Sequence, residues 1–141
     1  MRLIEEPLTE RVIAQNLPVL SSVEDDVSRK VREQYEESPY PRWVRLAIAP
    51  KAKSVAEVCK EVKLQLHSEN IKRVLSPSIL IAGCGTGQHS IGAASRFANS
   101  AVTAVDLSQA SLAYAQRKTS ELGITNVEYL RADILNLGEL G

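Results

Sequence analysis

The chain has 141 residues, a length typical of one domain, and its 44% hydrophobic and 24% charged residues are ordinary for a globular protein. Its 17 basic residues balance 17 acidic ones, so the composition gives no strong nucleic-acid signal. It holds no apolar run near the ~20 residues of a membrane helix and no apolar signal-peptide core, and its two cysteines are too few for a disulfide framework. We therefore expect a cytoplasmic protein without a membrane segment.

Charged residues and glycines divide the chain into two regions. Residues 1–75 hold 25 of the 34 charged residues, whereas all seven glycines follow residue 82. We expect a helical N-terminal region at 1–75, with a Pro-rich break at 38–41, and a second region at 76–141 that suits a buried sheet.

Helix signals occur at three places in the N-terminal region. Thr9 precedes a pattern that predicts a short helix ending before Pro18. A serine at 21–22 is placed to cap a second helix, which ends at the Pro-rich break. Ser54 begins a capping-box pattern, and apolar residues on one face extend the third expected helix to Leu66.

The second region alternates between apolar runs and helix patterns. Buried strands are expected at 79–82, 101–105 and 126–131, and helices at 88–97 and 109–122. Ser108 caps the longer helix and Gly123 ends it. This order predicts an α/β fold with three parallel strands, which form part of a doubly wound sheet.

The sharpest motif is a glycine-rich loop between the first strand and the next helix. It consists of Ala82, Gly83, Cys84, Gly85, Thr86 and Gly87. Such glycines let the backbone turn tightly and approach a ligand, and the helix N-terminus adds unpaired N–H groups. The loop thus predicts a site for a nucleotide-like ligand, with a mere tight turn as the alternative. The pattern G-x-G-x-x-G fails at Gln88 and at Ser90, which disfavours an NAD-dependent dehydrogenase.

Two acidic residues follow the next two strands. Asp106 lies 19 residues after Gly87, near the spacing at which an acid meets ribose hydroxyls. The alternative is an acid that caps the helix beginning after Ser108. Asp133 follows the third strand at the same carboxyl edge, where it is placed to accept a proton from an adenine amino group. Its alternative is a solvated loop acid.

Residues 79–137 resemble the N-terminal half of a class I S-adenosylmethionine-dependent methyltransferase domain, which has a Rossmann-like fold. The matching segments are Ile79–Gly87, Ala104–Ser108 and Asn126–Ile134. The resemblance implies S-adenosylmethionine as cofactor, with the glycine loop around its methionine and ribose. It also implies that the ribose and adenine are held by Asp106, Leu107, Asp133 and Ile134. In one departure, Ile81 stands where many members carry an acid.

Residues 29–43 resemble a segment that precedes the methyltransferase domain in certain bacterial proteins, some of which carry tetratricopeptide repeats. Tyr40, Arg42 and Trp43 form an aromatic and cationic cluster there, beside backbone fixed by proline. One interpretation is that the cluster covers the cofactor or touches substrate. The alternative is an N-terminal cap that packs on the sheet, which is compatible with a pocket wall.

These observations predict an S-adenosylmethionine-dependent methyltransferase with an unknown methyl acceptor, truncated to hold most of the cofactor site. The alternative is a non-catalytic cofactor-binding or scaffold module. The sequence identifies no catalytic residue, and its histidines and cysteines lack metal-ligand spacing. The strand at 79–82 is expected to lie at a sheet edge and to mediate self-association.

Overall fold

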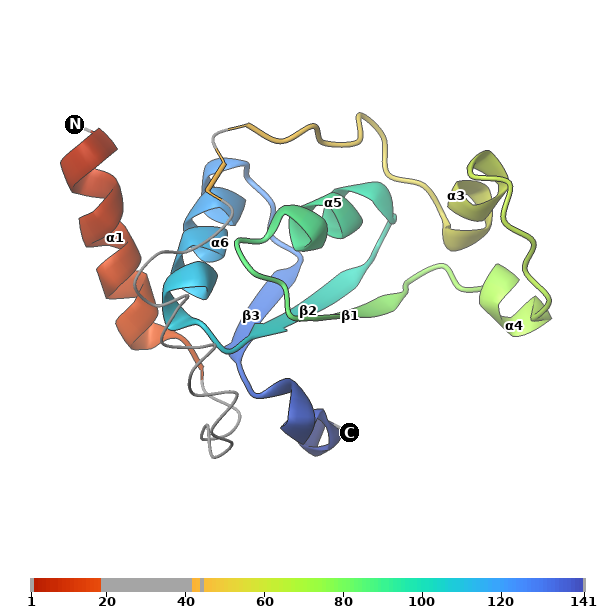
Figure 1. The fold of residues 1–141 in the computed structure, drawn as a ribbon. Coiled ribbons are helices and arrows are strands. Elements are labelled where there is room, and N and C mark those ends of the chain that lie inside the picture. The colour runs from red at the N-terminus through yellow and green to blue at the C-terminus, as the bar shows by residue number, and fades with distance from the viewer. Residues whose placement is uncertain (1, 19–41, 44, 141) are drawn as a thin grey trace.

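A computed structural model describes residues 2–18, 42–43 and 45–140 (Figure 1). Its elements in chain order are α1 (Arg2–Asn16), α3 (Val55–Glu61), α4 (Glu69–Lys72), β1 (Ser78–Ala82), α5 (Gln88–Arg96), β2 (Ala101–Asp106), α6 (Gln109–Glu121), β3 (Val127–Arg131) and the 3-10 helix η1 (Ile134–Leu140). The helix expected from residues 21–22 and the break at 38–41 lie outside the described residues.

The three strands form one parallel sheet in the order β1-β2-β3. In its register, Ile81 pairs with Ala104, which pairs with Tyr129. The helices α5 and α6 connect the successive strands (Figure 1). This arrangement confirms the predicted α/β fold class with three parallel strands.

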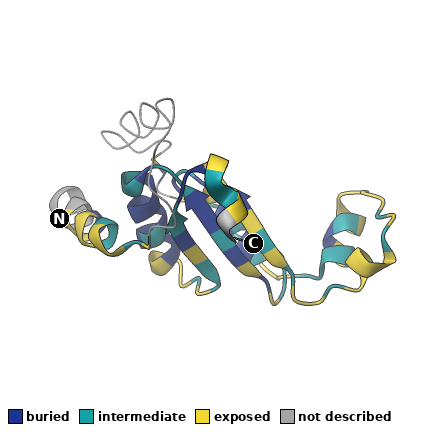
Figure 2. Ribbon diagram, turned by 90° about the horizontal axis from the view of Figure 1, so that it is seen from below, coloured by how far each residue is buried: buried dark blue, intermediate teal, exposed yellow. Residues whose placement is uncertain are grey.

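One face of the sheet carries the core, beneath α5 and α6 (Figure 2). The core comprises Ile81, Cys84, Ala93, Ala94, Val102, Ala104, Leu112, Ala115 and Tyr129. On the other face, Leu80 and Glu128 are exposed. The expectation of a buried first strand is therefore wrong, because β1 lies at the edge of the described sheet and only its Ile81 is buried.

Local capping signals fix several helix ends as predicted. Ser108 accepts a hydrogen bond from the Ser111 backbone N–H at 3.1 Å, and Gly123 follows the α6 C-cap with φ of +70°. Ser54 likewise accepts from the Glu57 N–H at 3.2 Å. These side chains satisfy backbone groups that a helix terminus leaves unpaired.

Two N-terminal helices differ from their predicted lengths. The structure ends α3 at Glu61, not near Leu66, because Lys63 adopts a left-handed φ of +57° and Val62 is exposed. It begins α1 at Arg2, well before Thr9, although the end before Pro18 is confirmed. Packing of α1 along α6 outweighs the local signal at its start.

The N-terminal region is joined to the sheet region by specific contacts. Arg117 of α6 donates from Nε to Glu10 of α1 at 3.0 Å, and the Arg131 N–H donates to the Pro18 carbonyl at 2.9 Å. Further along, the Lys53 N–H donates to the Arg96 carbonyl at the end of α5. Within the described part of the chain, none of the helices has the length and apolar character needed to cross a membrane.

Candidate functional site

The glycine loop is anchored to the end of the neighbouring strand β2. Both the Gly83 and the Cys84 N–H donate to the Val105 carbonyl, at 2.8 and 2.9 Å. The φ angles of Gly83, Gly85 and Gly87 are +74°, +55° and +90°, so the chain turns through left-handed conformations at alternate positions. Only glycine adopts these angles at low cost, which explains the spacing of the motif.

Asp106 connects the loop to the carboxyl edge of the sheet. Its Oδ2 accepts from the Gly85 N–H, and its Oδ1 accepts from the Ser108 N–H, each at 2.9 Å. The carboxylate therefore braces both the loop and the start of α6. An ionised carboxylate has about four lone-pair sites, so acceptor capacity remains for ligand hydroxyls. The capping and ligand-binding interpretations of this residue are thus compatible.

Residues after β3 come close to the first glycine of the loop. A Cβ atom built at Gly83 would lie 3.4 Å from Cδ1 of Ile134, which is half exposed. Asp133 is only 2% exposed, and its Oδ1 accepts from the Leu135 N–H at 3.0 Å. The interpretation of Asp133 as a solvated acid is therefore wrong. Leu107 is half-buried and follows Asp106 directly.

Gly87 has a packing role in addition to its backbone conformation. A Cβ there would lie 2.7 Å from the Ala115 Cβ and 3.0 Å from the Tyr129 hydroxyl. Both distances are shorter than ordinary contacts, so a side chain at this position would push the loop off α6 and β3. The third glycine of the motif thus lets the loop approach the core.

Two titratable groups behind the loop are held in their neutral forms. Burial, and secondarily the charge of Asp106, raises the pKa of the Cys84 thiol. Burial raises the pKa of Tyr129 to about 12, and its hydroxyl is bonded to Thr119. Both groups are therefore protonated near neutral pH. Cys84 packs in the core as a small apolar residue.

The N-terminal aromatic cluster is divided by the structure. Trp43 is 7% exposed and contacts both the loop and α6: its indole Nε1 donates to the Thr86 carbonyl at 3.0 Å. Arg42 is exposed, with its guanidinium 5.3 Å from the ring centroid of Tyr114. Tyr40 lies outside the described residues. Tyr114, which holds this segment, carries no motif that sequence analysis could single out.

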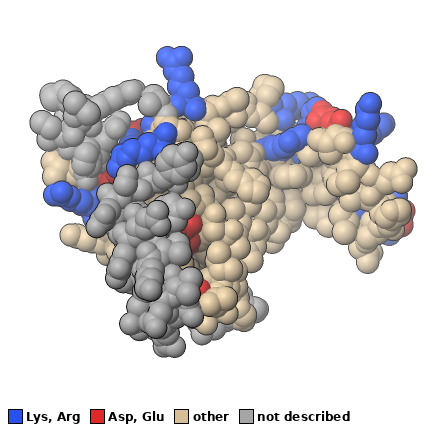
Figure 3. Space-filling view, viewed as in Figure 1, with Lys and Arg blue, Asp and Glu red and all other residues tan. Residues whose placement is uncertain are grey.

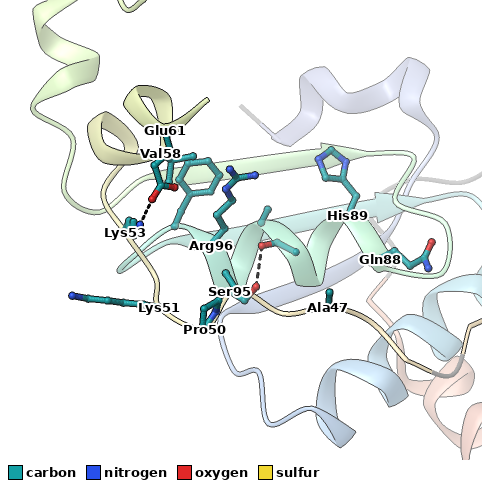
Figure 4. A pocket seen from close by; sticks show the side chains of 14 residues that line it. Ala47, Pro50, Lys51, Lys53, Val58, Glu61, Gln88, His89, Ser95 and Arg96 are labelled. Carbon is teal, nitrogen blue, oxygen red and sulfur yellow. Dashed lines mark hydrogen bonds and ion pairs between the residues drawn. The ribbon is translucent and has the colours of Figure 1, made fainter. Parts of the chain in front are cut away.

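A cavity of about 810 Å³ runs along α5, between that helix and residues 47–53 (Figure 4). Its lining extends from Gln88 and His89, directly after the glycine loop, to Arg96, near an ion pair of Lys53 with Glu61. On the face seen in Figure 3, Lys and Arg side chains lie in separate groups around a broad uncharged area.

Comparison with known domains shows what the sheet region is similar to. A family model described as a methyltransferase domain matches residues 79–140. This region is similar to methyltransferase domains. The match spans the glycine loop and both acidic residues, and it supports the resemblance to methyltransferases that the sequence motifs indicate.

Solved structures of two other proteins are similar to this chain. One, from work on conversion of a disulfide bond into a thioacetal group during echinomycin biosynthesis, is 24% identical, with a TM-score of 0.47 over 79% of this chain. Another, coclaurine N-methyltransferase with N-methylheliamine and SAH, is 18% identical, with a TM-score of 0.45 over 94% of this chain. This chain spans 40% of the length of each. No curated protein matches.

The residues of the methyltransferase domain region fit the cofactor of the family. Gly83 has no side chain on the side that faces Ile134, where a Cβ would lie 3.4 Å from Ile134 Cδ1. Asp106 retains acceptor capacity at the adjoining strand end. Ile81 is buried in the core, so that position gives no carboxylate to a methionine ammonium.

Proposed function

We propose that this chain forms the cofactor-binding part of an S-adenosylmethionine-dependent methyltransferase. The observation that carries the proposal is the hydrogen bond from the Gly85 N–H to Asp106 Oδ2. It joins a left-handed glycine loop to an acid at the carboxyl edge of a parallel sheet, where open α/β folds bind ligands. The region that matches the methyltransferase domain family contains both groups.

Each candidate residue has a role suited to its surroundings. The backbone of residues 82–87 lies along the methionine and ribose, since the glycines remove side chains from the path. Asp106 accepts from the ribose hydroxyls. Leu107 and Ile134 pack against the adenine, and Asp133 faces its amino group. Bound S-adenosylmethionine supplies the methyl group, and the chain binds and orients it for an acceptor.

Isothermal calorimetry with S-adenosylmethionine and with S-adenosylhomocysteine tests this function on the full chain. We expect binding of both, and no binding of NADH. The variant Asp106→Ala should weaken binding at least about tenfold, because hydrogen bonds to a charged acceptor contribute roughly 1.5–3 kcal/mol. Glu128→Gln is a matched control, since Glu128 is an exposed acid in the middle of β3.

The outcome that contradicts the proposal is a folded wild-type chain that gives no heat at high cofactor excess. Because Asp106 also braces Gly85 and Ser108, thermal unfolding of Asp106→Ala must be measured alongside. An unchanged affinity in that variant would remove Asp106 from the ribose site. The division of the chain near residue 75 and the cytoplasmic location stay predictions.

A further inference from the structure

Trp43 lies far from the glycine loop in sequence but contacts it in the structure. Its indole Nε1–H donates to the Thr86 carbonyl at 3.0 Å, across 43 residues of sequence. Both partners are buried, with Thr86 1% and Trp43 7% exposed. If the Thr86 carbonyl lost this donor, it would stay buried without a hydrogen bond, and the free-energy cost of removing it from water would not be offset.

The backbone of Trp43 is held as firmly as its ring. Its N–H donates to the Tyr114 hydroxyl at 2.8 Å, and the same hydroxyl donates to the Trp43 carbonyl. The two rings meet edge to face, with centroids 6.2 Å apart and an interplanar angle of 71°. One tyrosine of α6 thus binds both the N–H and the carbonyl of Trp43.

Buried cations complete the surroundings of the two rings. Lys118 Nζ lies 5.4 Å from the Trp43 centroid, and the Arg117 guanidinium lies 5.1 Å from the Tyr114 centroid. Both side chains are about 5% exposed, so these cation–π contacts are little screened by water. Contacts with α6 therefore hold the indole in place beside the loop.

Thr86 directly precedes the last glycine of the loop. The N–H groups of Gly83, Cys84 and Gly85 are bonded to the end of β2, and the Gly87 N–H donates to the Cys84 carbonyl at 3.1 Å. The indole N–H of Trp43 binds the carbonyl of the same Thr86–Gly87 peptide. The peptide that leads into α5 is thus held on both its N–H and its carbonyl side.

We propose that Trp43 is a positioning residue of the cofactor site, which fixes the Thr86–Gly87 peptide through its indole N–H. The cofactor role rests on the proposed function, but the effect on the loop does not. The indole N–H is bonded to the Thr86 carbonyl and the ring is buried, so Trp43 acts through the loop rather than by touching substrate.

Hydrogen exchange of the ligand-free chain tests the effect on the loop. Trp43→Phe keeps an aromatic ring and removes the N–H donor, so amides of residues 83–90 should exchange about five- to tenfold faster, with little change in β3. Ser100→Ala is the matched control. It removes a partly buried hydrogen bond to the Phe97 carbonyl, and one from the Asn126 amide, at the other end of the sheet, and it should leave the loop unchanged.

Tyr114→Phe is a second variant, and it carries the test if Trp43→Phe fails to fold. It frees the Trp43 backbone while keeping the indole, so exchange in the loop should rise here too. Unchanged exchange in both variants would overturn the proposal. An equal rise in the loop and in β3 would overturn it as well, since that pattern marks global destabilisation.

Cofactor binding supplies the remaining readout, and Trp43 is the only tryptophan of the chain. Titration of the wild type with S-adenosylhomocysteine should change the indole emission, and Trp43→Phe should weaken calorimetric binding about tenfold. If the wild type binds nothing while loop exchange still rises in the variants, the proposed function fails and the loop contact stands. If binding is unaffected in Trp43→Phe, the positioning role is overturned.

Discussion

At Gly87 the backbone angle and the neighbouring atoms both exclude a side chain. Gly123 separates these effects, because its φ is also positive while nothing lies within 4 Å of a Cβ built there. We expect Gly123→Ala to lower the free energy of unfolding by about 1 kcal/mol through backbone strain alone. Gly87→Ala should lower it by about 3 kcal/mol or more, since overpacking against Ala115 is added. Urea unfolding followed by circular dichroism measures both, and equal losses would contradict the packing role.

The two cysteines should differ strongly in reactivity. Cys84 is buried with a raised pKa, so its thiolate is scarce at pH 8, whereas Cys59 is partly exposed. Treating the native chain with a disulfide reagent at pH 8 should modify Cys59 first, and Cys84 only after urea is added. Peptide mapping identifies the modified thiol, and Cys59→Ser should abolish the fast phase. Similar rates for both thiols in the native chain would show that Cys84 is accessible.

Between elements, the buried ion pair of Glu10 and Arg117 joins α1 to α6. Their side chains are 11% and 5% exposed, so Glu10→Gln removes a carboxylate charge from beside a buried guanidinium, which keeps its ion pair with Glu121. We expect a loss of about 2 kcal/mol in the free energy of unfolding. The control Glu61→Gln breaks a half-exposed pair with Lys53 and should cost under about 0.5 kcal/mol. Calorimetric unfolding of both variants makes the comparison, and a smaller loss in Glu10→Gln would count against the docking role.

The elements that sequence predicted well are those fixed by neighbours in the chain. The strands follow from apolar runs, and the ends of α6 follow from Ser108 and Gly123. Contacts between distant segments escaped prediction, because neither a buried Glu10 nor a tyrosine within α6 has a local signature. The end of α3 was missed for a similar reason, since the apolar pattern continues past the left-handed Lys63.

The candidate site shows the same division. Spacing alone selected the glycine loop, Asp106 and Asp133, and the structure places the loop against Asp106. The hydrogen bond between Trp43 and Thr86 could not be derived from spacing, because it depends on how Trp43 packs against Tyr114 of α6.

For the whole molecule, we propose that the exposed edge of the described sheet is a surface for association. Within the described sheet, β1 pairs with β2 alone, and its Leu80 is 51% exposed. We expect sedimentation velocity to show self-association that increases with concentration. Leu80→Lys should reduce it, while Leu122→Lys, at an exposed leucine that ends α6, should not. A wild type that stays monomeric at every concentration would contradict this role for β1.

The Glu10–Arg117 pair joins two segments that are synthesised at different times. The two residues are 107 positions apart, so α1 leaves the ribosome about 5 to 20 s before its partner helix at ~5–20 residues per second. The contact between α1 and α6 therefore forms only once the segment around Arg117 has been translated.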